Sequence, residues 1–432
     1  MNTGNDRQVP GTDRLRPDGG MRFIYSWRWF GPNDRITLNQ VRQTGATGVV
    51  NALHQIPVGE VWSVGAILER KKMIEDAGLV WVVVESLPVS EDIKKKSGRY
   101  VQHIENYKTS LRNLAQCGVS TVCYNFMPIL DWSRTNLKCY NEDGTYTSEF
   151  QLHVFAAFDL FILKRKHAEA DYKPDVLERA EAYFKTLTDE QKQDLQDTIL
   201  YGLPGSMETY SPEAFKEMLQ TYQGISRKEL KSHLSHFLNQ VVPVAEEVGI
   251  KMAVHPDDPP WNLLGLPRIV STYEDLRDIV GMITSPANGI TLCTGSLGAG
   301  HFNDLTGIAR EMAPHIHFAH LRNLTRDTGL NFREDIFFEG DVSMVGVVRE
   351  LVKYGKRHFH ETGTPWLLPV RPDHGDQILD DVGKENYPGY SLYGRMKNLA
   401  EIKGLTMGVI SMMEDDVTTV QTSSVSPLTE GH

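Results

Sequence analysis

Hydrophobic and polar positions along the chain fall into a recurring unit. An amphipathic helical stretch ends at a glycine, a short run of mostly β-branched residues follows, and a polar residue near a proline closes the run. Glycine ends the helix because it adopts the left-handed conformation without strain. Residues 80–84 are apolar on both faces, which is typical of a parallel strand covered by helices. The unit occurs in "VRQTGATGVVNALHQIP", "RKKMIEDAGLVWVVVESLP", "LRNLAQCGVSTVCYNFMP" and "VAEEVGIKMAVHPDDP".

Four further runs complete a series of eight candidate strands. They are "MRFIYSW" before the others and "GITLCTG", "HIHFAHLRN" and "WLLPVRPDHG" after them. Eight strands with helical connections between most of them predict an α/β fold, a closed (β/α)8 TIM barrel. The alternative is an open doubly wound sheet, which usually has a glycine-rich phosphate loop after its first strand. The corresponding segment, "SWRWFGPND", lacks that pattern, so the barrel is favoured.

The segment 131–224 interrupts the alternation of strands and helices. It is too long for a connection between a strand and a helix of the barrel. We therefore expect a mostly helical insertion after the fourth strand, which either forms part of a lid over the barrel mouth or contacts another subunit. Helix starts are predicted at Thr188-x-x-Gln191, at Ser211-Pro212 and at Ser226-x-x-Glu229, the last for the helix that returns to the barrel.

Composition and charge narrow the class of protein. The chain has 432 residues, 40% of them hydrophobic, and a net charge of −11. This acidic excess argues against a nucleic-acid surface, which needs clustered Lys and Arg. No apolar run is long enough to span a membrane, the N-terminus has no apolar signal region, and four cysteines do not form a disulfide framework. We expect a cytoplasmic enzyme with a disordered leader (1–20), a catalytic domain (21–416) and a flexible tail (417–432).

Side chains that suit catalysis stand where the predicted strands end. In a (β/α)8 barrel, functional residues gather at these ends. Taken singly, each residue has a simpler explanation: His255 could cap a turn, and Cys293 could be a small buried hydrophobe. The strand ends carry His54, Glu85, Asn125, His255, Cys293, His320 and Asp373.

The last four of these residues form a candidate metal site. His255, Cys293, His320 and Asp373 end the fifth to eighth strands, and consecutive barrel strands are neighbours, so their ends face one small volume. Imidazole, thiolate and carboxylate donors suit a divalent transition metal, and the soft thiolate alone favours Fe²⁺ or Zn²⁺. A structural zinc site would more often be Cys-rich and closely spaced. Ligands spread over a rigid scaffold indicate a catalytic metal.

Six segments in order resemble the mannonate dehydratase family of the hexuronate pathway. The resemblance runs from about residue 22 to about residue 408 and departs from the family at the leader. It implies a xylose-isomerase-like barrel, conversion of D-mannonate to 2-dehydro-3-deoxy-D-gluconate and water, and Mn²⁺ or Fe²⁺ as cofactor. The family's metal ligands fall on the same four residues and its catalytic tyrosine falls on Tyr390. The segments are "SWRWFGPND", "GATGVVNALHQIPVGEVW", "YNFMPILDWSRTNL", "HPDDPP", "FAHLRN" and "RPDHG…PGYSLYGR".

The chemistry of such a dehydration explains what the site must supply. The proton on C2 is barely acidic because its loss adds a second negative charge beside a carboxylate. A divalent cation can stabilise that charge, a base must take the proton, and an acid must protonate the departing 3-hydroxyl. Tyr390 and His374 are the candidates for acid and base, and Asp373 could alternate between metal ligand and proton carrier. Which residue performs which step stays open.

Residues near the strand ends are candidates for holding a sugar acid. Arg322, two residues beyond His320, could bind the substrate carboxylate bidentately, or could form a surface ion pair. We also expect a homo-oligomer, with a dimer as the working hypothesis. Other candidate contacts are Asn125, Asp131, Trp132 and Arg134, Arg28 and Trp29, and His54 and Glu85.

Three other functions stay open at this point. A metal-dependent sugar isomerase or epimerase would need the same cation beside an α-hydroxy carbonyl group. An AP endonuclease-like metal enzyme shares the barrel type, although the net charge of −11 counts against DNA binding. A metal-binding protein without catalytic activity is the most remote alternative.

Overall fold

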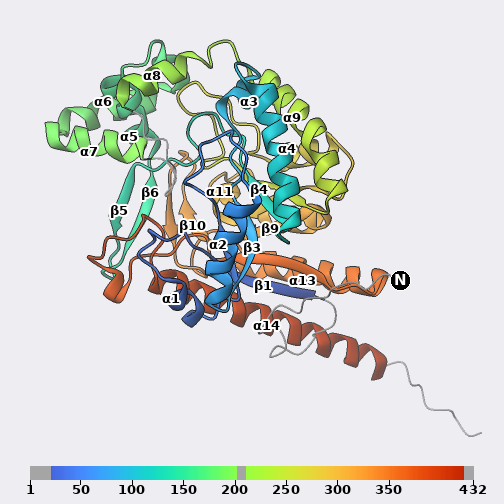
Figure 1. The fold of residues 1–432 in the computed structure, drawn as a ribbon. Helices are drawn as coiled ribbons and strands as arrows, with labels where there is room; N and C mark the ends of the chain where they lie inside the picture. Colours follow the sequence, from blue (N-terminus) through green and yellow to red (C-terminus); the bar gives the residue numbers. More distant parts are fainter. Residues whose placement is uncertain (1–20, 202–210, 423–432) are drawn as a thin grey trace, which may run out of the picture.

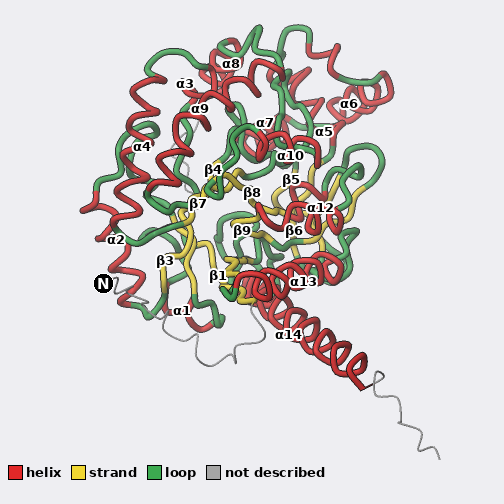
Figure 2. The backbone as a smooth tube through the Cα atoms, turned by 90° about the vertical axis from the view of Figure 1, so that its right-hand side faces the viewer, coloured by secondary structure: helices red, strands yellow, loops and turns green. Residues whose placement is uncertain are grey.

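A closed barrel of parallel strands forms the centre of the molecule (Figures 1 and 2). The computed structural model describes residues 21–201 and 211–422. β1 pairs with both β2 and β12, so the sheet closes on itself and has no free edge. The predicted (β/α)8 barrel is confirmed, and the open sheet is excluded. Around the barrel the strands are β1 (Met21–Arg28), β12 (Trp366–Arg371), β9 (Ile316–His320), β8 (Asn288–Cys293), β7 (Lys251–Val254), β4 (Thr121–Tyr124), β3 (Val80–Glu85) and β2 (Gly48–Asn51).

Helices cover the outside of the barrel between the strands. The glycines expected to end three of them, Gly78, Gly118 and Gly249, have φ values of 75°, 76° and 74°, so each takes the left-handed conformation. The helices are α1 (Leu38–Gln43), α2 (Val64–Asp76), α3 (Glu91–Lys95), α4 (Tyr100–Gln116), α9 (Arg227–Glu247), α10 (Tyr273–Gly281), α11 (Thr294–Gly298), α12 (Leu305–Met312), α13 (Met344–Thr362) and α14 (Tyr393–Thr422), with 3-10 turns at η4 (Ala313–His315) and η5 (Leu379–Asp381).

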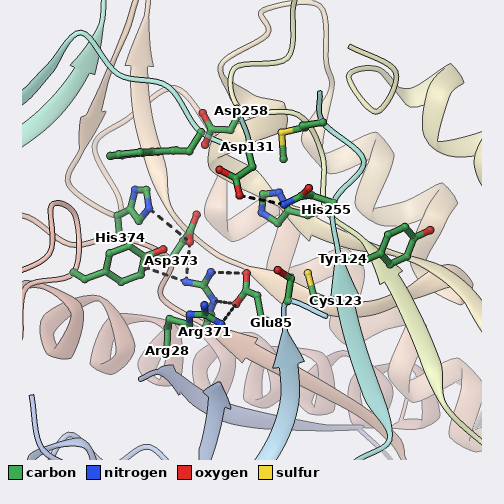
Figure 3. A pocket seen from close by; sticks show the side chains of 15 residues that line it. Arg28, Glu85, Cys123, Tyr124, Asp131, His255, Asp258, Arg371, Asp373 and His374 are labelled. Atoms are coloured by element: carbon green, nitrogen blue, oxygen red, sulfur yellow. Dashed lines mark hydrogen bonds and ion pairs between the residues drawn. The ribbon is translucent and has the colours of Figure 1, made fainter. Parts of the chain in front are cut away.

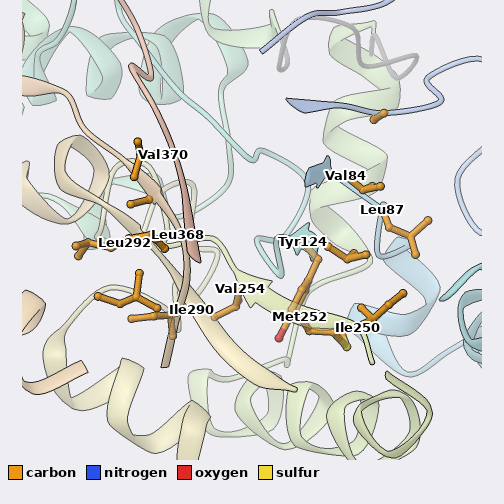
Figure 4. Close-up of a cluster of buried hydrophobic side chains, with 14 of the residues drawn as sticks. Val84, Leu87, Tyr124, Ile250, Met252, Val254, Ile290, Leu292, Leu368 and Val370 are labelled. Carbon is orange, nitrogen blue, oxygen red and sulfur yellow. The ribbon is translucent and has the colours of Figure 1, made fainter. Parts of the chain in front are cut away.

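Alternating side chains along the strands divide the core into two parts. Outward-facing residues such as Met252, Val254 and Ile290 pack beneath the surrounding helices (Figure 4). A smaller apolar cluster consists of residues at the alternate positions and fills the barrel interior. Its members are Val50, Val83, Cys123, Ala253 and Phe318. This cluster closes the barrel interior, so a ligand is confined to the open end above it.

The insertion after the fourth strand is mostly helical, as expected, and it also contains two strands. Its helices gather at one end of the molecule (Figure 1). The helix starts predicted at Thr188, Ser211 and Ser226 are confirmed, since each side chain caps its helix. Residues 202–210 lie outside the described part. The elements are β5 (Asn136–Tyr140), β6 (Tyr146–Phe150), α5 (Leu152–Ala157), η2 (Phe158–Leu163), η3 (Ala168–Asp171), α6 (Pro174–Thr186), α7 (Asp189–Leu200) and α8 (Pro212–Gln220).

A second, antiparallel sheet stands outside the barrel and was not predicted. β10 (Asn323–Arg326) and β11 (Phe332–Asp335) follow β9 and join the insertion strands in the order β10-β11-β6-β5. The pairing of Phe332 with Phe150 fixes the register, and their stacked rings have centroids 5.7 Å apart. The sheet therefore links the insertion to the loop after β9, a contact between segments far apart in sequence.

The C-terminal helix α14 packs against α13, and its far end projects away from the barrel (Figures 1 and 2). It reaches Thr422 and thus extends into the segment 417–432 that was expected to be a flexible tail. The rest of that segment, 423–432, and the expected leader, 1–20, lie outside the described residues. Within the described ranges, no helix combines the length and the apolar character needed to cross a membrane.

Candidate active site

The strand ends place polar side chains directly above the apolar interior of the barrel. Successive side chains along a strand point to opposite faces of the sheet, so a residue two positions beyond an interior residue also points to the interior. Glu85 stands two positions beyond Val83, and His255 stands two positions beyond Ala253. His320 follows Phe318 in the same manner, and their rings touch with centroids 4.6 Å apart. The alternation of strand residues therefore creates a polar layer over an apolar floor.

Three of the expected metal ligands meet at one point. His255, Cys293 and His320 each offer a ligand atom, and these atoms all lie within 4.8 Å of one another. Strand pairing explains the approach: Cys293 and His320 are partners in the register of β8 and β9. Cys293 and His320 are fully buried, and His255 is partly exposed. The set can hold a cation and still leave a side open to a ligand.

The hydrogen bonds around the two imidazoles indicate where their lone pairs point. Nδ1 of His255 lies 2.7 Å from the carbonyl oxygen of Pro256, which only accepts, so Nδ1 carries the proton and Nε2 is a lone-pair donor. Nδ1 of His320 receives a hydrogen bond from Arg371 at 3.5 Å, and its Nε2 lies 3.3 Å from Oε1 of Glu85. Nε2 of His255 and Nδ1 of His320 are 3.2 Å apart, close enough for both to bind one cation.

Cys293 has the surroundings of a ligand rather than of a reactive free thiol. Its sulfur receives the backbone N–H of Ser296 at 3.4 Å and lies 3.4 Å from Oδ2 of Asp373. Burial and the charge of Asp373 raise the pKa of the Cys293 thiol to about 12. A bound divalent cation reverses this preference, since coordination deprotonates a thiol. The donor set of two imidazoles, a sulfur and a neighbouring carboxylate thus fits a transition metal.

Asp373 borders the cluster and is held by two arginines. Its Oδ1 lies 3.7 Å from Nδ1 of His320 and 2.7 Å from a terminal nitrogen of Arg371. Its Oδ2 lies 3.0 Å from Nε of Arg322. Burial alone would raise the pKa of Asp373, but the charge of Arg371, followed by His374, His320 and Arg322, holds it well below its ordinary value. Asp373 is therefore an ionised oxygen donor at the edge of the cluster.

Glu85 is the outer partner of the cluster on β3. Arg371 donates to it with two nitrogens, at 2.9 Å and 3.1 Å, in a bidentate pair. Burial opposes ionisation of Glu85, yet Arg371, His320 and Arg28 lower its pKa to about 2. The ionised carboxylate beside Nε2 of His320 orients that ring, as carboxylates commonly do behind metal-bound histidines.

A buried ion network joins the barrel to the outer sheet. Arg322 donates to Asp258 at 2.6 Å and also pairs with Glu334 on β11. Arg134 donates to the same two carboxylates, at 2.7 Å and 2.8 Å. All four side chains are at most 5% exposed. Burial opposes ionisation of both carboxylates, but the arginines hold the pKa of Asp258 and of Glu334 well below the ordinary range.

His374 and Tyr390 stand together on the far side of the cluster. Nδ1 of His374 lies 2.7 Å and 2.9 Å from the two oxygens of Glu334, so that ring nitrogen is a donor. The rings of His374 and Tyr390 are edge to face, with centroids 5.1 Å apart. Burial raises the pKa of Tyr390 to about 12, so its hydroxyl keeps its proton in the protein alone. Together they offer an imidazole with a fixed tautomer and a protonated phenol.

These residues surround a cavity at the open end of the barrel with about 540 Å³ of unfilled space (Figure 3). The view shows Glu85, Arg28 and Arg371 on one side and Asp131 and Asp258 on the other. Its lining consists of Arg28, Glu85, Ser86, Cys123, Tyr124, Asn125, Met127, Asp131, Trp132, His255, Asp258, Arg371, Asp373, His374 and Tyr390. The mixture of charged and aromatic side chains suits a small polar ligand.

Several residues expected to contact substrate lie elsewhere. Trp29, the residue after β1, is buried with Arg70 over its ring. His54 receives a hydrogen bond from Arg28. Arg134 and Arg322 belong to the ion network and are not among the described residues that line the cavity. Among the expected substrate contacts, those that do line it are Arg28, Glu85, Asn125, Asp131 and Trp132.

Sequence reasoning missed three residues that organise the site. Asp258 and Arg371 stand within the stretches "HPDDPP" and "RPDHG", so their positions beside expected ligands were an available signal. Glu334 had no such signal, because its role depends on the pairing of β11 with β6.

The chain is similar to a known family, to individual proteins of that family and to a solved structure. A family model described as D-mannonate dehydratase (UxuA) matches residues 21–416. The mannonate dehydratase of Marinomonas sp. (strain MWYL1) is 51% identical over 390 residues, which cover 90% of this chain and 100% of that protein. That of Chromohalobacter salexigens is 50% identical over 386 residues, covering 89% and 98%. The crystal structure of mannonate dehydratase from Streptococcus suis serotype2 matches with a TM-score of 0.71 at 31% identity, covering 96% of this chain and 99% of that one.

The carboxyl of Asp376, next to the site, should make stability fall as the pH rises. Burial raises its pKa to about 6, with Glu334 and Asp335 adding to the effect. A raised pKa means that the folded state binds the proton more tightly, so the contribution is complete below about pH 4 and is lost as the pH passes about 6.

Asp376→Asn should remove this loss and stabilise the protein at pH 7 by about 1–3 kcal/mol relative to wild type. Denaturant titrations from pH 4 to pH 7, at equal metal content, measure the difference. Asp380→Asn, at an exposed position nearby, is the control for the loss of one negative charge. Parallel pH profiles for wild type and Asp376→Asn would contradict this reading.

Proposed function

The chain belongs to the D-mannonate dehydratase family, and we propose that it performs this reaction with a divalent cation held by His255, Cys293, His320 and Asp373. The enzyme is a lyase that converts D-mannonate to 2-dehydro-3-deoxy-D-gluconate and water. Family membership supports this function over the isomerase, epimerase and endonuclease alternatives. The observation that carries the metal proposal is the meeting of three ligand atoms within 4.8 Å, with Nε2 of His255 and Nδ1 of His320 3.2 Å apart.

Each proposed ligand has a definite donor atom. Nε2 of His255, Nδ1 of His320, the sulfur of Cys293 and a carboxylate oxygen of Asp373 would hold the ion. When bound, a divalent cation supplies Lewis-acid stabilisation for the charge that develops beside the substrate carboxylate. Mn²⁺ and Fe²⁺ are the proposed ions, and the sulfur ligand favours Fe²⁺ of the two.

We assign the base to His374 and the acid to Tyr390. Glu334 accepts a hydrogen bond from the N–H at Nδ1, which leaves Nε2 of His374 with the lone pair, and His374 lines the cavity. His374 would take the C2 proton, and Tyr390 would donate its hydroxyl proton to the 3-hydroxyl as the C3–O bond breaks and water departs. The enol that remains then tautomerises to the 2-keto-3-deoxy acid. In this assignment Asp373 holds its place and carries no proton.

The other side of the cavity would hold the polyol chain. Asn125 and Asp131 carry hydrogen-bonding groups, and Trp132 presents an indole N–H that has no protein partner. Arg322 is proposed as a positioning residue for Asp373, Asp258 and Glu334, since all three lie on its guanidinium group.

A homodimer and a cytoplasmic location stay expectations from the sequence, and the insertion is the surface proposed for the subunit contact.

The function itself is tested by product analysis. Protein purified without chelator is incubated with D-mannonate, and the product is examined by periodate–thiobarbiturate colour and by NMR. A 2-keto-3-deoxy acid is expected. Recovery of an epimer or a ketose, with no 2-keto-3-deoxy acid, would instead assign the protein to the isomerases or epimerases.

Cys293→Ser should lower metal content and activity while the fold is kept. The change replaces a charged ligand by a neutral hydroxyl group and alters little volume. Elemental analysis of the purified variant measures the metal, and thermal unfolding reports the fold. Cys117→Ser, at a buried thiol at the end of α4, is the matched control and should keep its metal. Full metal content in Cys293→Ser would show that Cys293 is only part of the core.

Tyr390→Phe should lower the turnover number with D-mannonate by roughly 10²–10⁴-fold, the usual contribution of general acid–base catalysis. The ring keeps its contacts with Phe30 and His374, so stability and metal content should hardly change. Steady-state kinetics measure the effect, with Tyr393→Phe as the control on the same segment. If Tyr390→Phe retains more than about half of the wild-type turnover, the acid must be sought elsewhere, with His374 first.

A further inference from the structure

The cavity is lined by arginines whose hydrogen-bonding capacity is used very differently. Among the described residues, its lining contains Arg28 and Arg371. The nitrogens of Arg371 donate to Glu85 twice and to Asp373, so its guanidinium group is saturated by the protein. Arg371 therefore has no capacity left for a ligand.

Arg28 at the end of β1 has capacity left. Its NH1 nitrogen is buried and has no hydrogen-bond partner among the described residues, and Oε2 of Glu85 pairs with it at 3.9 Å. Its NH2 nitrogen faces Nε2 of His54 at 3.2 Å. Burial and the charges of Arg28 and Arg70 lower the pKa of His54 to about 3, so His54 is neutral and brings no negative charge. Arg28 therefore has only a long ion pair with Glu85, and its buried NH1 nitrogen still lacks a hydrogen-bond acceptor among the described residues.

Arg28 has contacts on its backbone and on its guanidinium group, the latter with His54 and Phe30. Arg395 on α14 donates one hydrogen bond to the backbone carbonyl of Arg28 and another to that of Tyr390, at 2.9 Å and 3.2 Å. The Phe30 ring lies 4.9 Å from the guanidinium carbon of Arg28. This fixation means that the unpartnered nitrogen does not depend on a mobile side chain, and an anion can be bound without a large loss of side-chain entropy.

Arg28 also stands at the correct end of the cavity. Glu85 lies between Arg28 and the proposed metal ligands: its Oε2 faces Arg28, and its Oε1 lies 3.3 Å from Nε2 of His320. Arg28 is therefore separated from that cluster by a single carboxylate. Arg28, His374 and Tyr390 all line the same cavity, so an anionic group bound to Arg28 shares that cavity with both of them.

We propose that Arg28 binds the C1 carboxylate of the sugar-acid substrate and makes the site selective for an acid over a neutral sugar. The proposal rests on the dehydratase function proposed above and gives to Arg28 the role expected of Arg322 from the sequence. The substrate carboxylate supplies the acceptor that the NH1 nitrogen of Arg28 lacks, in a charge-assisted hydrogen bond. Arg322 cannot take this role, because Asp258, Glu334 and Asp373 occupy its nitrogens.

The test separates binding from turnover. The ligands are the 3-deoxy analogue of D-mannonate, which has no 3-hydroxyl to lose, and its neutral C1 amide. Calorimetry gives the dissociation constant of each for wild type, Arg28→Gln and Arg28→Lys at matched metal content. In Arg28→Gln, affinity for the acid should fall on the order of 10- to 100-fold, while affinity for the amide changes less than about threefold. Arg28→Lys should lie between, because it keeps the charge and loses the fork.

Arg310→Gln, on the exposed face of α12, is the control for the loss of one positive charge and should bind both ligands like wild type. The proposal is overturned if wild type does not prefer the acid, or if Arg28→Gln keeps the preference. It is also overturned if Arg28→Gln loses both ligands equally with an unchanged melting temperature. Should Arg28→Gln not fold, Arg28→Lys decides by the same criterion. Absence of the 2-keto-3-deoxy product in wild type would reject the proposed dehydratase function. Retention of the preference for the acid in Arg28→Gln would reject only the proposed role of Arg28.

Discussion

Pairing of buried charges is the constraint on which the whole site depends. A charge inside a protein is costly unless an opposite charge and hydrogen bonds compensate it, and removal of one partner leaves the other uncompensated. At the open end of this barrel, Arg371 is shared by Glu85 and Asp373, and Arg322 reaches Asp258, Glu334 and Asp373. Because each of these four carboxylates pairs with at least one arginine, all four stay ionised although they are buried. Their positions, and those of the imidazoles beside them, follow from this pairing.

The same constraint has a consequence for loading of the site. Arg28, Arg134, Arg322 and Arg371 together carry the same formal charge, with opposite sign, as Glu85, Asp258, Glu334 and Asp373. A divalent cation, the Cys293 thiolate and one substrate carboxylate also sum to zero. Binding of the cation, with loss of the Cys293 proton, and of the substrate carboxylate together leaves the net charge of the site unchanged. Binding of either one alone changes that net charge. Binding of the two should consequently be cooperative, with the cation favouring the anionic ligand.

Sequence patterns predicted the part of the site that depends on strand ends. Helix stops and apolar runs predicted the eight strands, and the neighbouring ends of consecutive strands predicted that His255, Cys293 and His320 lie together. The same reasoning failed where a strand ends early. β2 ends at Asn51, so His54 lies beyond the strand in a loop and contacts Arg28 instead of lining the cavity.

Other features were beyond the reach of local pattern because distant segments create them. Arg322 stands two residues beyond His320, which correctly placed it near the site, but its partners come from three other segments of the chain. Asp258 stands in the loop after β7, and Glu334 stands on a strand that pairs with the insertion. No spacing within the sequence records that meeting. The residue that fixes the tautomer of His374 could therefore be found only from the fold.

The outer sheet has a consequence for protein engineering. The barrel supplies the ligand cluster from its own strand ends, yet the carboxylate that orients His374 comes from β11, which is held by β6 of the insertion. The proposed catalytic residues and the carboxylate that orients His374 thus belong to two modules that are separate in sequence. A chimaera that grafts only these strand ends onto another barrel would inherit a cation site with an undirected imidazole. The hairpin and the strand that supports it have to be transplanted as one unit with the barrel loops.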